Sequence, residues 1–155
     1  MALEFNTIGV KLKYAVESTA GTRPTTGYTE IPDIKDFPDM EMSPSRIEVT
    51  NLSDTVRRYI SGILEAGDDM AFTANLTTAL KTLWASIVAA YCTAHAAGKQ
   101  MWFELAIPNF DSFYWAGQPA QLGISGKGVS DVMETTLHIT PNEIVGFAAA
   151  STTTP

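Results

Sequence analysis

The chain of 155 residues is long enough to bury a hydrophobic core and short enough to form one domain. Only 17% of its residues are charged, and its net charge of −7 is concentrated in residues 30–69, where ten acidic and four basic side chains give −6. This excess of acidic residues argues against binding to nucleic-acid phosphates. The absence of a run of about 18 apolar residues argues against a membrane-spanning helix. A single cysteine excludes an internal disulfide.

The N-terminal third begins with a strand and then loses regular periodicity. Apolar and polar residues alternate from Ile8 to Glu17, which predicts a half-buried strand. Residues 18–28 are rich in Gly, Pro and Thr and predict a loop. Three prolines between residues 29 and 45 argue against a central strand, so we expect a long irregular connection over about residues 32–68. Only short extended pieces are expected within it, at residues 30–31 and 46–50.

The middle of the chain carries a second strand and the single expected helix. Residues 69–77 alternate and predict a strand, after which apolar residues recur at a spacing of three and four. This spacing predicts a helix over about residues 79–97. Thr77 or Thr78 would cap its beginning, and Gly98 would end it.

The last third predicts further strands and a loose tail. Strands are expected at residues 101–107 and 112–118, at 129–140 and, as a short piece, at 143–147. Residues 148–155 form a low-complexity tail. The whole pattern predicts a mostly β fold, a β-sandwich or open barrel of about six to eight strands with one flanking helix, as a single domain over residues 1–147.

Histidine and cysteine residues offer little for catalysis or metal binding. Cys92 and His95 have the spacing of two metal ligands, but the sequence holds no second Cys/His pair to complete a tetrahedral site. His138 lies four residues from Glu134, and no nucleophile-elbow motif accompanies it. We therefore expect no enzymatic activity, no metal and no cofactor.

Other patterns also favour structural interpretations. Gly123, Gly126 and Gly128 do not have Walker spacing and precede a strand, so they indicate a hinge. The aspartates that recur from residue 33 to residue 39 lack the calcium-loop pattern of an EF-hand. Strand aromatics are more often core residues than a sugar-binding platform, although both interpretations stay open. The aromatics concerned are Trp102, Phe103, Phe110, Phe113, Tyr114 and Trp115.

The order of segments resembles the major tail tube proteins of long-tailed bacteriophages. The resemblance lies in GVKLKYAVESTAGTRPTTGYTEIPDI, in DDMAFTANLT, in the hairpin WFELAIP…SFYWAGQP and in the closing TLHITP, which together cover most of residues 9–141. The resemblance implies six-fold rings of a β-sandwich with a flanking helix, stacked into a hollow tube through which the genome leaves the capsid. It implies a virion protein made in the host cytoplasm, whose partners are further copies of itself and the tail terminator, tape measure and baseplate proteins. DNA would pass without specific binding, and the protein would not insert into a membrane.

Two sets of site residues follow if the resemblance holds. Side chains opposite the apolar rows would face the lumen, because side chains alternate along a strand, and these are Thr73, Asn75, Glu104 and Glu134. The long connection would reach an adjacent subunit through its charged residues, which are Asp33, Asp36, Asp39, Glu41, Arg46, Arg57 and Arg58. An acidic lumen would repel phosphates over roughly 8–10 Å.

Three alternatives stay open on the sequence alone. A monomeric carbohydrate- or ligand-binding β-sandwich would use the strand aromatics, and a small barrel enzyme would need an acid–base pair near His138. A tube subunit of a contractile injection or secretion system would share the tail tube fold.

Overall fold

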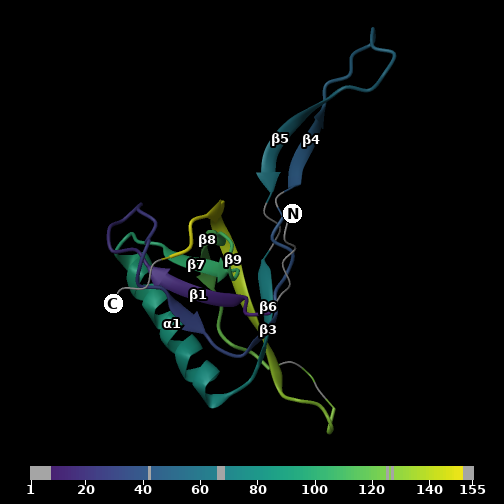
Figure 1. The fold of residues 1–155 in the computed structure, drawn as a ribbon. Coiled ribbons are helices and arrows are strands. Elements are labelled where there is room, and N and C mark those ends of the chain that lie inside the picture. Colours follow the sequence, from purple (N-terminus) through teal and green to yellow (C-terminus); the bar gives the residue numbers. More distant parts are fainter. Residues whose placement is uncertain (1–7, 42, 66–68, 125, 127, 152–155) are drawn as a thin grey trace.

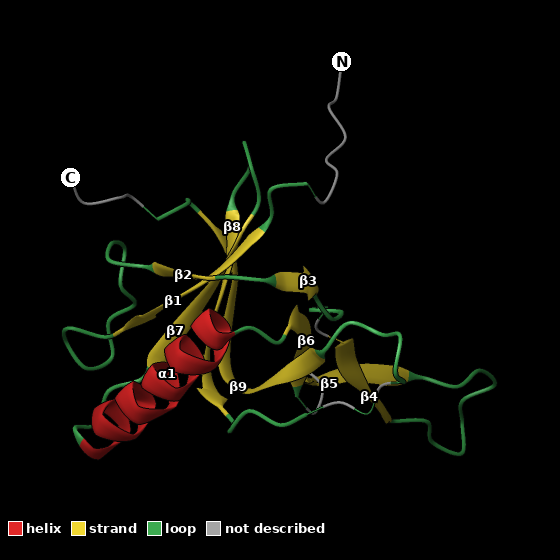
Figure 2. Cartoon of the chain, turned by 90° about the horizontal axis from the view of Figure 1, so that it is seen from below, coloured by secondary structure: helices red, strands yellow, loops and turns green. Residues whose placement is uncertain are grey.

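The computed structural model describes residues 8–41, 43–65, 69–124, 126 and 128–151. A seven-stranded antiparallel sheet in the order β2-β1-β7-β8-β9-β6-β3 curls into a nearly closed barrel, with α1 alongside it (Figures 1 and 2). The mostly β fold with one flanking helix is therefore confirmed. The elements are β1 (Lys11–Val16), β2 (Thr29–Ile31), β3 (Ile34–Asp36), β4 (Ser43–Glu48), β5 (Tyr59–Glu65), β6 (Met70–Asn75), α1 (Thr78–Ala96), β7 (Met101–Ala106), β8 (Ser112–Pro119) and β9 (Glu134–Ala148).

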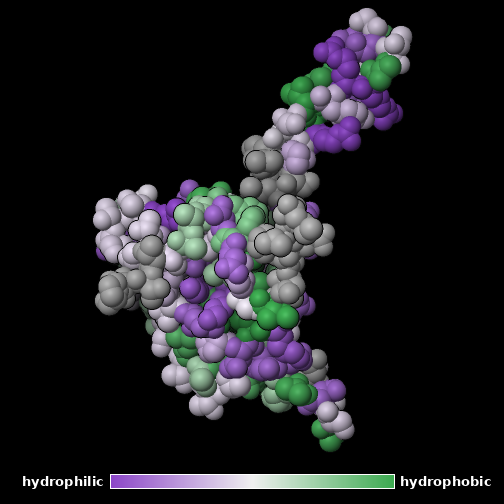
Figure 3. Space-filling view, in the orientation of Figure 1, coloured by the Kyte–Doolittle hydropathy of each residue, from purple (hydrophilic) through white to green (hydrophobic). Residues whose placement is uncertain are grey.

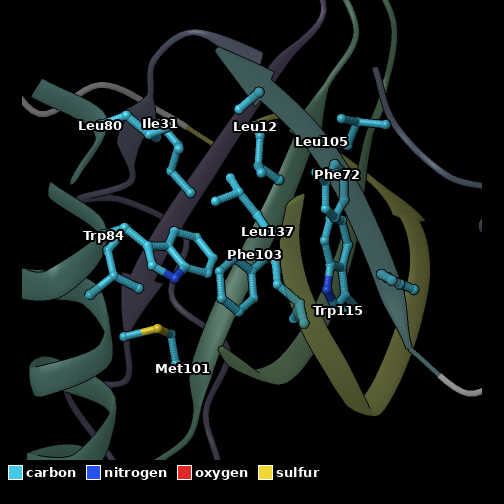
Figure 4. Packing of buried hydrophobic residues seen from close by; sticks show 14 of the residues in the cluster. Leu12, Ile31, Phe72, Leu80, Trp84, Met101, Phe103, Leu105, Trp115 and Leu137 are labelled. Carbon is cyan, nitrogen blue, oxygen red and sulfur yellow. The ribbon is translucent and has the colours of Figure 1, made fainter. Parts of the chain in front are cut away.

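The core fills the inside of the curled sheet and the space under α1 (Figure 4). Alternation along β6 buries Phe72 and Ala74 completely, as the sequence predicts. From β7 and β8, Phe103 and Trp115 stack on each other with ring centroids 5.8 Å apart. Strand aromatics on this face are therefore core residues.

Helix α1 begins and ends where its sequence predicts. Thr77 caps it by accepting a hydrogen bond from the Leu80 backbone N–H. Gly98 has a positive φ of 73°, and the N–H of Lys99 donates to the Ala94 oxygen at 2.8 Å, which closes the C-terminal turn. The helix buries Leu80, Trp84, Ile87 and Ala94. Cys92 and His95 are exposed, and the buried row of the helix continues through Ala94 instead.

The prediction of a long irregular connection over residues 32–68 is wrong where β3, β4 and β5 lie, although the extended piece expected at residues 46–50 overlaps β4. This part of the chain contains β3, which pairs with β6 at the sheet edge, and a separate hairpin of β4 and β5. The hairpin projects away from the barrel (Figure 1), and Ile47 and Ile60 within it are exposed. None of the hairpin residues whose burial the structure describes is buried in the chain, so its sequence shows none of the alternation that reveals a half-buried strand.

The two strands expected at residues 129–140 and 143–147 form one strand. β9 begins only at Glu134 and runs to Ala148, with two register shifts against β8. Pro141 lies at one of them, opposite Gly117, which explains how a proline is accommodated within a long strand. A Cβ on Gly117 would lie only 2.7 Å from Ile139 Cγ2, so this close approach requires glycine.

Candidate functional site

Three of the four side chains expected to face a lumen lie together on β6 and β9. Asn75 is directly opposite Glu134, and Thr73 is directly opposite Thr136, which was not among the expected residues. These four paired residues share the sheet face turned away from the core. Lys35 on the neighbouring β3 forms an ion pair with Glu134. We call Thr73, Asn75, Glu134 and Thr136 the polar wall.

The fourth side chain, Glu104, is not brought together with the polar wall. It lies on β7, which β8 and β9 separate from β6, and its side chain is fully buried. Ser151 donates two hydrogen bonds to its carboxylate, from the backbone N–H at 3.1 Å and from the hydroxyl at 3.0 Å. The Lys13 ammonium lies 3.8 Å away. The C-terminal segment of the same chain therefore encloses Glu104.

Two tyrosines complete the cover over this part of the sheet. The Tyr114 hydroxyl donates to the Ala149 oxygen at 2.7 Å, and the Arg23 guanidinium lies 4.2 Å from the Tyr114 ring centroid. Burial raises the pKa of Tyr28 from 10.0 to about 12, with Arg23 opposing and Glu104 adding to the rise. Burial, together with the negative charge of the nearby Glu104, also raises the pKa of Tyr114.

Arginines expected at a subunit interface lie on the projecting hairpin. We call residues 43–65 the arm. Ile47 and Ile60 are directly opposite each other on it and are 49% and 53% exposed. Each arginine has a neighbour within the arm: Arg46 stacks on Tyr59 at 4.1 Å, Arg57 lies 4.0 Å from Glu48, and Arg58 lies 3.6 Å from Asp54.

The acidic residues of the same expected set lie at the barrel and not on the arm. Asp33 accepts a hydrogen bond from the Thr77 hydroxyl at 2.7 Å, which ties it to the start of α1. Asp36 accepts from the Phe37 N–H. Asp39 and Glu41 are exposed. The seven expected interface residues thus form a basic group on the arm and an acidic group on the barrel.

Asp39 and Glu41 border an apolar groove that no pattern in the sequence reveals. The groove has a volume of about 350 Å³, and we call it the end groove. Phe147 in its lining is 59% exposed and packs edge-on against Phe113, with ring centroids 5.4 Å apart. The lining consists of Phe37, Pro38, Asp39, Met40, Glu41, Leu105, Ile107, Phe113 and Phe147.

Residues considered for chemistry are dispersed in the structure. Across the described ranges, no group of three or more His, Cys, Asp and Glu side chains could hold a metal ion. His138 lies 2.6 Å from Asp69, whereas the nearby Glu134 pairs with Lys35. His95 stacks on Tyr91 at 5.7 Å. No helix in the described part of the chain is long and apolar enough to cross a membrane.

Sequence comparisons found no matching family model and no matching curated protein. Solved structures match over nearly the whole chain. A chain of the anti-feeding prophage baseplate, symmetrised six-fold, matches at a TM-score of 0.58 and 8% identity, covering 98% of this chain and all of the other. A chain of a native gene transfer agent virion matches at 0.60 and 13% identity, covering 94% of this chain and all of the other.

A third match comes from the tail of an empty gene transfer agent particle with C6 symmetry. Its TM-score is 0.58 and its identity 11%, and it covers 94% of this chain and all of the other. The chain therefore has a fold found in phage-derived tail and baseplate structures. At these identities the likeness concerns the fold.

Proposed function

We propose that this protein is a structural virion protein, the major tail tube subunit of a phage or phage-like particle. Six copies form a ring, and stacked rings form a hollow tube for passage of the genome into the host. The protein is not an enzyme in this proposal. Its partners are further copies of itself and the proteins that end, measure and anchor the tail.

One observation carries the proposal. The fold extends over 94–98% of this chain and over the full length of chains from six-fold tail and baseplate assemblies. The likeness therefore extends through the barrel, the helix and the connecting segments together. The dispersal of the histidines and acids supports a structural role as well.

The polar wall supports a lumen-facing role for β6 and β9. Thr73 and Thr136 present small neutral side chains, and Lys35 pairs with the single carboxylate, Glu134. Such a surface gives phosphate groups no cluster of basic residues to bind. The chain as a whole remains acidic at −7, which keeps a ring of six copies strongly anionic.

Molecular mass and micrographs of the purified full chain test the proposal. We expect light scattering at micromolar concentration to show hexamers or larger species, and electron microscopy to show rings with a central hole that stack into tubes. A protein that stays monomeric up to millimolar concentration would refute the proposal. Single rings that never stack would instead favour a ring of the baseplate, as the likeness to the anti-feeding prophage chain allows.

A further inference from the structure

The end groove is an exposed aromatic surface of the kind that marks a protein–protein contact. Phe37, Phe110 and Phe147 are 37%, 45% and 59% exposed, and Phe110 packs on Phe147 with ring centroids 5.6 Å apart. Exposed apolar side chains gathered around a hollow indicate an interaction site, whereas scattered ones do not. The acidic side chains of Asp39 and Glu41 border this hollow.

The arm has the complementary composition. Ile47 and Ile60 share one face, and the turn that joins the two strands exposes Leu52 and Val56 at 108% and 73%. Figure 3 shows hydrophobic side chains (green) beside hydrophilic ones (purple) on the projecting part of the molecule. A two-stranded hairpin is only marginally stable without further packing, so its apolar residues need a partner surface.

The charges of the arm indicate that its partner surface is the end groove. Arg57 and Arg58 are largely exposed, at 76% and 62% of their side chains, and their ion pairs within the arm are long and weak. The end groove offers two carboxylates to them. A second apolar groove, beside α1, is lined by Lys81 and by no acidic residue, so it would repel the same arginines.

The arm of a chain does not occupy its own end groove. Residues 37–41 form one wall of the groove and lead directly into the arm, which projects away from the barrel (Figure 1). A second copy can supply the arm. Because the two surfaces of the contact differ, it is heterologous and can propagate around a ring or along a tube.

We propose that the end groove binds the arm of a second copy, with Ile47 and Ile60 on the aromatic surface and Arg57 and Arg58 facing Asp39 and Glu41. This inference rests on the proposed assembly into rings and tubes, and it names the residues of one contact within that assembly.

A complementation experiment with two charge-reversed full-length chains tests this contact. The arm variant carries Arg57→Glu and Arg58→Glu, and the groove variant carries Asp39→Lys and Glu41→Lys. All four side chains are exposed or partly exposed, so both variants should fold, which circular dichroism checks. Alone, each variant places like charges in the contact, and we expect the concentration needed for assembly to rise by more than about tenfold.

An equimolar mixture should restore assembly at the wild-type concentration. The acidic arm of one variant then meets the basic groove of the other, and the unaltered basic arm meets the unaltered acidic groove. A matched control moves the lysines to Glu30 and Glu143, which are exposed acids outside the groove. In a mixture with this control chain, the acidic arm of the arm variant still meets an acidic groove, so the arm variant should not assemble at the wild-type concentration.

Each outcome decides the matter. Single variants that assemble like wild type, a mixture that stays dispersed, or rescue by the control chain would each overturn the arm–groove contact while leaving the tube proposal intact. Normal assembly of the single variants would assign the groove to a different partner. A wild-type chain that never assembles would overturn the proposed function, and this inference with it. A second variant, Ile47→Ser with Ile60→Ser, leaves every charge unchanged and removes only the apolar side chains of the arm. It should also fail to assemble.

Discussion

Glu104 and Ser151 lie 47 residues apart in the sequence and are joined by two hydrogen bonds, from the Ser151 N–H and hydroxyl to the Glu104 carboxylate. Tyr114 adds a third bond to this segment through the Ala149 oxygen. The sheet is therefore covered on both faces near β7 and β8: by the core on one side and by the C-terminal segment and Arg23 on the other. A carboxylate that the sequence assigns to a lumen has a structural role within its own chain.

Replacing Glu104 tests this role. Glu104→Ala removes the acceptor of both Ser151 bonds and leaves the Lys13 ammonium without its buried partner. Hydrogen bonds to charged groups contribute about 1.5–3 kcal/mol each, so we expect the free energy of unfolding to fall by at least about that amount. Urea denaturation measures it. Glu104→Gln, which keeps an acceptor, should lose less, and Glu143→Ala at an exposed site should lose almost nothing. Equal stability of all three would contradict the enclosed position of Glu104.

The tyrosines beneath the C-terminal segment should make the free energy of unfolding depend on pH in the alkaline range. The pKa of Tyr28 is raised from 10.0 to about 12 in the folded chain. The unfolded chain therefore releases this proton first, so the stabilising contribution is intact below pH 10 and is lost as pH rises from 10 to 12. Tyr28→Phe removes this titration. We expect the variant to lose less stability than wild type between about pH 9.5 and about pH 11.5 in urea titrations. Parallel pH profiles would contradict the shifted pKa.

Helix α1 should act as scaffold. Trp84 and Ile87 are 1% and 0% exposed, and the Trp84 indole N–H donates to the Ala120 oxygen at 2.7 Å. Truncation to alanine should destabilise the subunit by about 3–5 kcal/mol at Trp84 and about 2–5 kcal/mol at Ile87. Thermal unfolding of the monomer measures both. Cys92→Ser, on the exposed side of the same helix, is the control and should melt like wild type. A Trp84 variant of normal stability that fails to assemble would make this face an interface instead.

Elements with one buried face were predictable from sequence. β6 and α1 each bury a periodic row, so alternation and the three-four spacing located them to within about two residues. The same alternation identified three members of the polar wall, because Thr73 and Asn75 are the residues that follow the buried Phe72 and Ala74. Local periodicity is sufficient wherever the core covers a single face.

The arm and the enclosure of Glu104 could not be found this way. No arm residue with a described side chain is buried, so Ile47 and Ile60 follow no period against the barrel. Glu104 lies on the face that alternation marks as outward, and the segment that covers it is distant in sequence. The end groove is likewise formed by residues from four separate parts of the chain. These features depend on tertiary arrangement and leave no local pattern.

Excision of the arm should separate folding from assembly. Deleting residues 38–45 would remove a wall of the end groove and part of β4 together. The structure favours replacing residues 46–61 with a short Gly-Ser linker, which leaves the barrel intact. We expect a soluble monomer with the melting temperature of the wild-type monomer and no tubes in micrographs. Tubes of normal appearance from this variant would show that the arm is dispensable.

The polar wall should control how easily DNA moves through a tube. Glu134→Lys reverses the charge beside Lys35, so two lysines replace an ion pair on β9 and β3. Six copies would carry about twelve more positive charges per ring, and these would attract phosphates over roughly 10 Å at 0.1 M salt and roughly 30 Å at 0.01 M. Particles with this variant should release DNA more slowly than wild type, and the difference should grow as salt is lowered. Fluorescence of a DNA-binding dye after triggered ejection measures the rate.

Two further variants place the same charge change outside the polar wall. Glu104→Lys puts it at an enclosed position, so it should destabilise the subunit and reduce particle yield instead of slowing release. Asp111→Lys puts it at an exposed position in the loop between β7 and β8 and should form particles that release DNA at the wild-type rate. If Glu134→Lys particles contain the variant and still release DNA at that rate at every salt concentration, Glu134 does not face the lumen.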